Sequence, residues 1–150
     1  MNIPFHPSEP DVAFQFSAYQ VCPDSPQLEH DFLCVVASLE AHSDHPMATE
    51  LVQIARLNNI LPVTVDKLQT FPDRGVGALV TLPKEHSPRA VLMGTKEFLE
   101  ESGLRAPEIL ESAYRRWEAE SDTMVMLAGW DEWVRGLIKF QLKPIPIASK

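Results

Sequence analysis

The chain has 150 residues, 45% of them hydrophobic, and a formal net charge of -8. This size and composition are typical of one folded domain with its own core, and they exclude a disordered chain. The lack of a basic patch or stripe in the sequence argues against nucleic acid, and against an anionic membrane surface, as partners. No apolar run approaches the roughly 20 residues that span a bilayer, and the first residues lack a signal-peptide pattern, so we expect a cytoplasmic domain with no direct membrane insertion.

The first half of the chain predicts one strand and two helices. Residues 12–21 are rich in aromatic side chains and partly alternate between apolar and polar, as strands do. Ser25 then suits the cap of a helix whose first turn contains Pro26. Apolar residues follow at helical spacing as far as Leu39, and the same spacing recurs over residues 47–58. Because the link between them is short, we expect these helices to form a hairpin.

The second half changes from helical to strand periodicity. Strands are predicted at 61–68, 77–82, 87–94, 123–130 and 133–140, and helices at 95–103 and 106–120. Gly103 suits the left-handed residue that follows a helix end. This order predicts an α+β domain, with helices packed on an antiparallel sheet. We expect a single domain over residues 1–150, with loose ends at 1–11 and 143–150.

The stretch SLEAHSDHPMATEL, residues 38–51, places several polar side chains between the two helices of the first half. Imidazole and carboxylate groups are zinc ligands, so Glu40, His42 and His45 suggest a metal site. Their spacing matches no recognised metal signature, however, and no fourth strong ligand lies nearby in the sequence. We therefore expect no tightly bound metal, and metal binding through His42 and His45 is kept as an alternative.

Helix capping explains part of the same stretch. Ser43 or Asp44 can accept hydrogen bonds from the free amides at the start of the second helix, and Pro46 fits its first turn. Glu40 and His45 are not needed for this capping.

Familiar catalytic and phosphate-binding motifs do not occur in the sequence. It contains no G-x-S-x-G elbow, no Walker loop and no G-x-G-x-x-G, and neither cysteine lies in a context that would lower its pKa. We therefore predict no catalytic residue. The glycines of RGVGA at 74–78 let a ligand approach the backbone closely, although such a pattern is more often a tight turn. The segment LMGT at 92–95 is likewise typical of a strand end.

Each of these motifs is a weak signal alone, but their order along the chain is specific for one family. The chain contains L-E-x-x-S-x-H-P at the helix corner, F-P-x-x-G-V before a strand, V-L-x-G before a short helix, and a final hairpin with G-x-I. This order resembles the nucleotide-binding (N) domain of heavy-metal-transporting P-type ATPases, the copper and zinc pumps, from about residue 17 to about residue 140. The resemblance implies about six antiparallel strands flanked by two helical pairs, in agreement with the prediction from periodicity.

The resemblance also implies a ligand and the residues that bind it. The ligand is an adenine nucleotide, ATP with or without Mg²⁺. Glu40 and His45 occupy the family's adenine-binding positions, and a carboxylate can accept a hydrogen bond from the exocyclic amine while an imidazole presents its flat face or a ring nitrogen. The remaining positions that match the family's nucleotide site are Pro46, Gly75, Val76, Gly77 and Gly94.

Three residues depart from the family pattern or modify it. Asp73 replaces the first glycine of P-G-x-G, and Thr95 replaces the asparagine that follows Gly94. If the Asp73 carboxylate lies near a phosphate, one repulsive pair at about 4 Å costs roughly 1 kcal/mol in water and roughly 4 kcal/mol at an intermediate dielectric. Either Mg²⁺ or Arg74 would have to offset that cost.

The family's phosphorylation loop, D-K-T-G-T, does not occur in this chain. The chain is therefore not expected to be catalytic alone. In a pump it would hold ATP for a separate phosphorylation domain, in cis or in trans, by positioning. The alternative is a domain that has kept the fold but lost nucleotide binding and acts as a regulatory or protein-interaction module. Asp73 and Thr95 favour this alternative.

Overall fold

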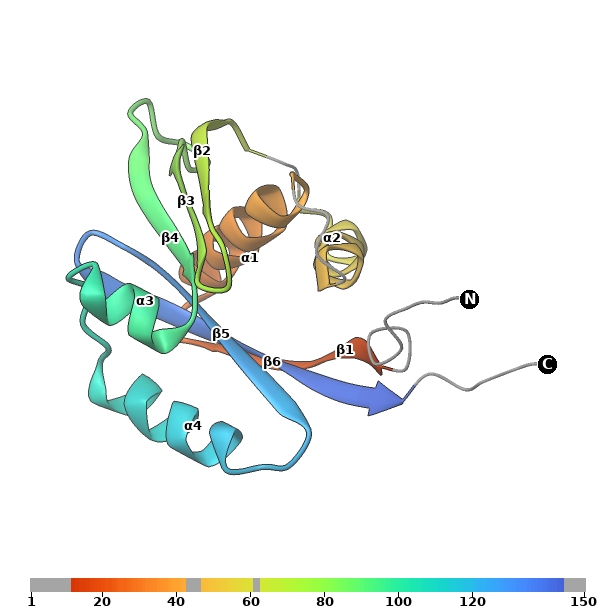
Figure 1. Ribbon diagram of the computed structural model, residues 1–150. Helices are drawn as coiled ribbons and strands as arrows, with labels where there is room; N and C mark the ends of the chain where they lie inside the picture. The colour runs from red at the N-terminus through yellow and green to blue at the C-terminus, as the bar shows by residue number, and fades with distance from the viewer. Residues whose placement is uncertain (1–11, 43–46, 61–62, 145–150) are drawn as a thin grey trace.

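The computed structural model describes residues 12–42, 47–60 and 63–144 (Figure 1). The elements follow the chain as β1 (Val12–Val21), α1 (Pro26–Glu40), α2 (Met47–Leu57), β2 (Val65–Phe71), β3 (Gly75–Val80), β4 (Arg89–Gly94), α3 (Lys96–Glu101), α4 (Glu108–Glu118), β5 (Thr123–Trp130) and β6 (Trp133–Pro144). None of the described helices has the length and apolar character needed to cross a membrane.

The strands form one six-stranded antiparallel sheet in the order β1-β6-β5-β4-β3-β2. The two helical pairs belong to two separate hydrophobic clusters. Alternation along β6 explains the separation, because Ile138 and Phe140 pack in the cluster with α1 and α2 while Leu137 packs with α3 and α4. The predicted α+β fold, with an antiparallel sheet flanked by two helical pairs, is confirmed.

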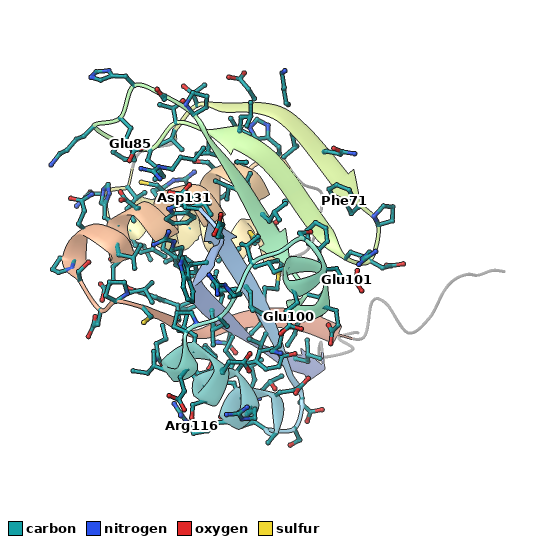
Figure 2. The ribbon with its side chains drawn as sticks, turned by 90° about the vertical axis from the view of Figure 1, so that its left-hand side faces the viewer. Phe71, Glu85, Glu100, Glu101, Arg116 and Asp131 are labelled. Atoms are coloured by element: carbon teal, nitrogen blue, oxygen red, sulfur yellow. The ribbon has the colours of Figure 1, made fainter. Side chains whose placement is uncertain are left out.

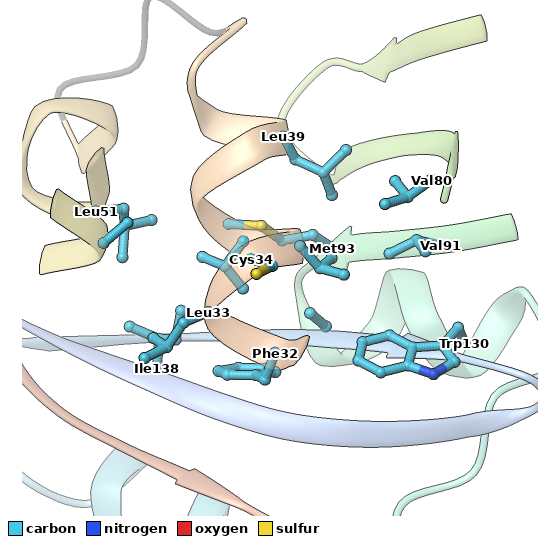
Figure 3. Close-up of a cluster of buried hydrophobic side chains, with 14 of the residues drawn as sticks. Phe32, Leu33, Cys34, Leu39, Leu51, Val80, Val91, Met93, Trp130 and Ile138 are labelled. Carbon is cyan, nitrogen blue, oxygen red and sulfur yellow. The ribbon is translucent and has the colours of Figure 1, made fainter. Parts of the chain in front are cut away.

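The larger core lies between α1 and the sheet (Figure 3). Phe32 and Leu39 on α1 are almost fully buried, as are Val91 and Met93 on β4 and Trp130 on β5. The Cys34 thiol is buried in the same cluster, and burial raises its pKa to about 11. A buried thiol of this kind packs much as a small apolar side chain does.

Two helix ends follow the sequence prediction. The Ser25 hydroxyl accepts a hydrogen bond from the Leu28 amide at 3.1 Å, and Pro26 stands in the first turn of α1. Gly103, just beyond α3, has a φ of +93°, the left-handed conformation expected there. The capping predicted for Ser43, Asp44 and Pro46 falls outside the described residues.

Several strand boundaries differ from the prediction. The strand expected at 77–82 is β3, Gly75–Val80, and the strand expected at 87–94 is β4, Arg89–Gly94. The strand expected at 61–68 is β2, which begins at Val65 and continues to Phe71. The last strand runs on to Pro144, so its final residues overlap the expected loose end at 143–150. Pairing with β1 explains this extension, since Pro144 lies opposite Val12 in the sheet. A partner more than a hundred residues away gives no local signal in the sequence.

Candidate functional site

A cavity of about 360 Å³ opens beside the turn between β2 and β3. Four parts of the chain line it, namely the end of α1, the β2–β3 turn, the end of β4 and the first half of β5. The lining residues are Glu40, Thr70, Phe71, Pro72, Asp73, Arg74, Gly75, Val76, Met93, Gly94, Thr95, Met124, Val125 and Met126. Its volume and apolar walls suit a small organic ligand.

Glu40, the last residue of α1, provides the buried polar group of this cavity. Its side chain is 4% exposed, and its Oε1 atom has no hydrogen-bond partner among the described residues. Burial raises the pKa of this carboxyl to about 7. A buried acceptor without a donor costs on the order of 1–3 kcal/mol, so native proteins contain few of them. A ligand that brings an N–H donor to Oε1 would recover that cost.

The turn between β2 and β3 forms the mouth of the cavity. The Arg74 amide donates to the Phe71 carbonyl at 2.9 Å, Pro72 takes the second position, and Asp73 takes the third with a φ of +63°. Proline followed by a residue of positive φ is the pattern of a type II turn, whose third position favours glycine. Asp73 therefore occupies, with the backbone conformation of a glycine, the place where the family pattern has one.

Gly75 and Gly94 face each other across β3 and β4. A Cβ atom on Gly75 would lie 2.9 Å from the Gly94 Cα and would overlap the Met93 carbonyl. One on Gly94 would lie 2.7 Å from the Gly75 Cα and would overlap the Arg74 carbonyl. The close approach of the two strands thus requires both glycines, whether or not a ligand is bound.

Val76 and Gly77 differ in their relation to the cavity. Val76 lines it, as the resemblance implies. Gly77 is buried and is not among the lining residues. A Cβ atom there would lie 2.9 Å from Cδ2 of Leu92, the flexible end of a side chain on the neighbouring strand β4.

Arg74 and Thr95, the other two residues expected to modify ligand binding, both contact α3. The Arg74 guanidinium pairs with Glu101 and lies 5.7 Å from the centre of the Phe98 ring. Figure 2 shows Glu101 on α3, on the same side of the molecule as Phe71 at the end of β2. Thr95 caps α3, since its hydroxyl accepts a hydrogen bond from the Phe98 amide at 3.1 Å.

His45 and Pro46 lie outside the described residues, so the expected pairing of Glu40 with His45 stays a prediction. His42 is exposed just beyond α1. Within the described ranges, no three His, Cys, Asp or Glu side chains are grouped so as to hold a metal ion. The alternative of a metal site also depends on His45.

Sequence reasoning missed the apolar walls of the cavity. Met93 on β4 and Met124 and Met126 on β5 line it, and all three belong to or pack on the larger core. The i, i+2 spacing of the two β5 methionines in a predicted strand was the available signal, because such residues share a face. Flexible methionine side chains adapt well to a flat aromatic ligand.

No family model matches the chain. It is 30% identical over 110 residues to the copper-exporting P-type ATPase of Staphylococcus haemolyticus, a match that covers 73% of this chain and 13% of that protein. It is 29% identical over 100 residues to the copper-exporting P-type ATPase of Vibrio cholerae, covering 67% of this chain and 10% of that protein. The chain thus spans only a small part of the curated relatives it matches.

Solved structures of P-type ATPases are also similar to this chain. The N-domain of HMA6, a copper-transporting P-type ATPase, superposes with a TM-score of 0.64 at 21% identity, covering 85% of this chain and 98% of that one. A zinc-transporting PIB-type ATPase in the E2.Pi state gives 0.66 at 17% identity, covering 89% of this chain and 20% of that one. The fold is that of a P-type ATPase N-domain.

The sequence similarity indicates which P-type ATPases the chain is related to. The curated relatives are copper-exporting pumps, and the structural neighbours include N-domains of copper- and zinc-transporting pumps. The chain is therefore related to the N-domain of heavy-metal-transporting P-type ATPases, which confirms the resemblance seen in its motifs.

Proposed function

We propose that this chain is an adenine-nucleotide-binding domain, and that in the cytoplasm it holds ATP for a phosphorylation domain supplied in cis or in trans. The observation that carries the proposal is the Glu40 carboxyl, which is buried in the cavity with an unpartnered oxygen. The adenine ring offers what that oxygen lacks, since its exocyclic amine is an N–H donor on a flat and largely apolar group.

The geometry of the cavity supports one orientation of the nucleotide. The base lies against Val76, Met93 and the β5 methionines, with its amine toward Glu40. A contact from His45 is what the family resemblance implies, and that residue lies outside the described ranges. The ribose and phosphates then lie toward the β2–β3 turn, beside Gly75 and Gly94. The domain supplies no acid or base, and its contribution to phosphoryl transfer is to position ATP, with or without Mg²⁺.

An NMR titration with adenosine, AMP and ATP tests the proposal. We expect amide shifts centred on residues 40 to 47 and 74 to 77. The variant Glu40→Ala should weaken binding about tenfold or more, because a hydrogen bond to a charged or partly charged group is lost. Glu108→Ala serves as the control, since Glu108 is an exposed acid on α4 that does not line the cavity.

The second candidate is a regulatory or protein-interaction module that has kept the fold without nucleotide binding. The acidic Asp73 at the mouth of the cavity is the observation in its favour. If no amide shifts at millimolar adenosine, AMP or ATP, the nucleotide proposal is wrong and the interaction module takes its place.

A further inference from the structure

The mouth of the cavity carries a net negative charge. Besides Glu40 at the buried end, the charged lining residues are Asp73 and Arg74. The one cation of this pair already has an anionic partner, because Arg74 forms its ion pair with Glu101. Asp73, Arg74 and Glu101 together sum to about one negative charge, although Glu101 borders the mouth through its ion pair and does not itself line the cavity. This count holds whether or not the exposed ion pair stays closed.

The next cation along the chain, Lys96, is also engaged. Lys96 follows Thr95 in the sequence, but its ammonium group lies 2.6 Å from Glu100 and 3.6 Å from Glu111, and it packs over the Tyr114 ring. No lysine lines the cavity within the described ranges. Phosphate sites in proteins usually combine such cations with free backbone amides.

Two backbone amides at the mouth are engaged within the protein. The Arg74 amide donates to the Phe71 carbonyl at 2.9 Å, which closes the turn. The Thr95 amide donates to the Arg74 carbonyl at 2.9 Å, which ties the turn to the start of α3. Both N–H groups are therefore used within the protein, and neither points at a ligand.

These observations separate the two ends of the cavity. The Glu40 end lacks a donor and is suited to adenine, whereas the Asp73 end repels each phosphate charge that is added to the ligand. We propose that this cavity selects adenine ligands by charge, so that adenosine and AMP bind more tightly than ADP and ATP, with Asp73 and Glu101 as the specificity-determining residues. Since this selectivity presupposes the adenine site proposed above, its test must include a ligand without phosphate.

The test is a titration series by calorimetry, with adenosine, AMP, ADP and ATP in Mg²⁺-free buffer at low salt. The measured quantity is the ratio of the ATP dissociation constant to the adenosine dissociation constant. We expect this ratio to exceed one in the natural protein and to fall toward one as the salt concentration rises to about 0.5 M, because salt screens exposed charges. Added Mg²⁺ should also lower it, since the ion neutralises part of the phosphate charge.

Two variants test whether Asp73 and Glu101 cause the preference for ligands with fewer phosphates. Asp73→Asn keeps a side chain that tolerates positive φ and removes the charge, so it should lower the ratio roughly three- to tenfold while the adenosine constant stays unchanged. Glu101→Gln should act in the same direction, because it leaves the Arg74 cation free to contact a phosphate. Asp122→Asn is the matched control, since Asp122 is also exposed with a positive φ of 58° but does not line the cavity.

The outcomes are distinguishable. ATP binding more tightly than adenosine in the natural protein without Mg²⁺ overturns the selectivity and leaves the adenine site standing. An equal change in ATP and adenosine affinity on Asp73→Asn also overturns it, because a charge effect must grow with phosphate number. Failure of adenosine itself to bind contradicts the adenine site and, with it, this inference.

Discussion

The two ends of the cavity differ in burial and in the partners of their charged groups. At the α1 end, the Glu40 carboxyl is buried among apolar side chains and its oxygen lacks a donor. At the turn end, Asp73 and Arg74 are exposed. The Arg74 and Thr95 amides donate to backbone carbonyls there, and the Arg74 guanidinium pairs with Glu101. The α1 end thus holds a buried acceptor that lacks a donor, whereas the Arg74 cation at the turn end already has an anionic partner.

The largest expected effect concerns the glycine pair under the turn. Gly94→Ala should lower the free energy of unfolding by about 3 kcal/mol or more, because the new methyl group meets the Arg74 carbonyl and the Gly75 Cα. Urea denaturation measures it. Gly103→Ala is the control, since Gly103 has a positive φ but open space around it and should cost only about 1 kcal/mol. Equal losses would show that strand packing does not demand the glycine at Gly94.

Glu40 should make the stability of the domain depend on pH. Its pKa is raised from 4.5 to about 7, so the folded protein binds the proton more tightly than the unfolded chain. The stabilisation from this group is complete below pH 4.5 and is lost as the pH rises through about 7, by roughly 3 kcal/mol. Glu40→Gln should remove that loss and be the more stable protein at pH 8. Parallel stability curves for the two proteins between pH 4.5 and 8 would refute the burial of this carboxyl.

Variants at Thr95 test whether this residue serves only as the cap of α3. Thr95→Ala should cost about 1 kcal/mol of stability, because the cap of α3 is lost. Thr95→Asn should stay within a few tenths of a kcal/mol, since asparagine caps helices equally well. Thermal or urea unfolding of both variants measures the difference. A destabilisation by asparagine as large as that by alanine would show that the hydroxyl does more than cap the helix.

Asp73→Gly should give the smallest change in stability and a selective change in binding. Glycine relieves a positive φ that aspartate tolerates with some cost, so the free energy of unfolding should rise by about 0.5 kcal/mol. The same change should tighten ATP more than AMP, as measured by calorimetry. Equal effects on the two nucleotides would show that Asp73 does not face the phosphates.

The sequence predicted the fold where local patterns control it. The strand β5 was expected at 123–130 and is found there, because its apolar pattern ends at the tight turn before Trp133. The edge strand β2 was displaced, since most of its side chains are exposed and its apolar pattern is therefore weak. Its bounds depend on pairing with β3, which is a tertiary property.

The sequence indicated several of the residues that line the cavity, but neither the burial of Glu40 nor the ion pair of Arg74. The motif order brought Glu40, Gly75, Val76, Gly94 and Asp73 to one cavity. The burial of the Glu40 carboxyl could not be foreseen, because it depends on how the turn and β5 close over the end of α1. The ion pair of Arg74 with Glu101 could not be foreseen either, since it joins a turn to a helical residue 27 positions further along the chain.

The most direct test of the account is the pKa of the Glu40 carboxyl, measured by carbon-detected NMR with and without saturating adenosine. The free protein should titrate with a pKa near 7, as burial requires. Adenosine should lower this pKa, because an N–H donor that reaches the buried oxygen favours the charged form. A pKa that adenosine leaves unchanged or raises would contradict the central claim that this carboxyl receives the base.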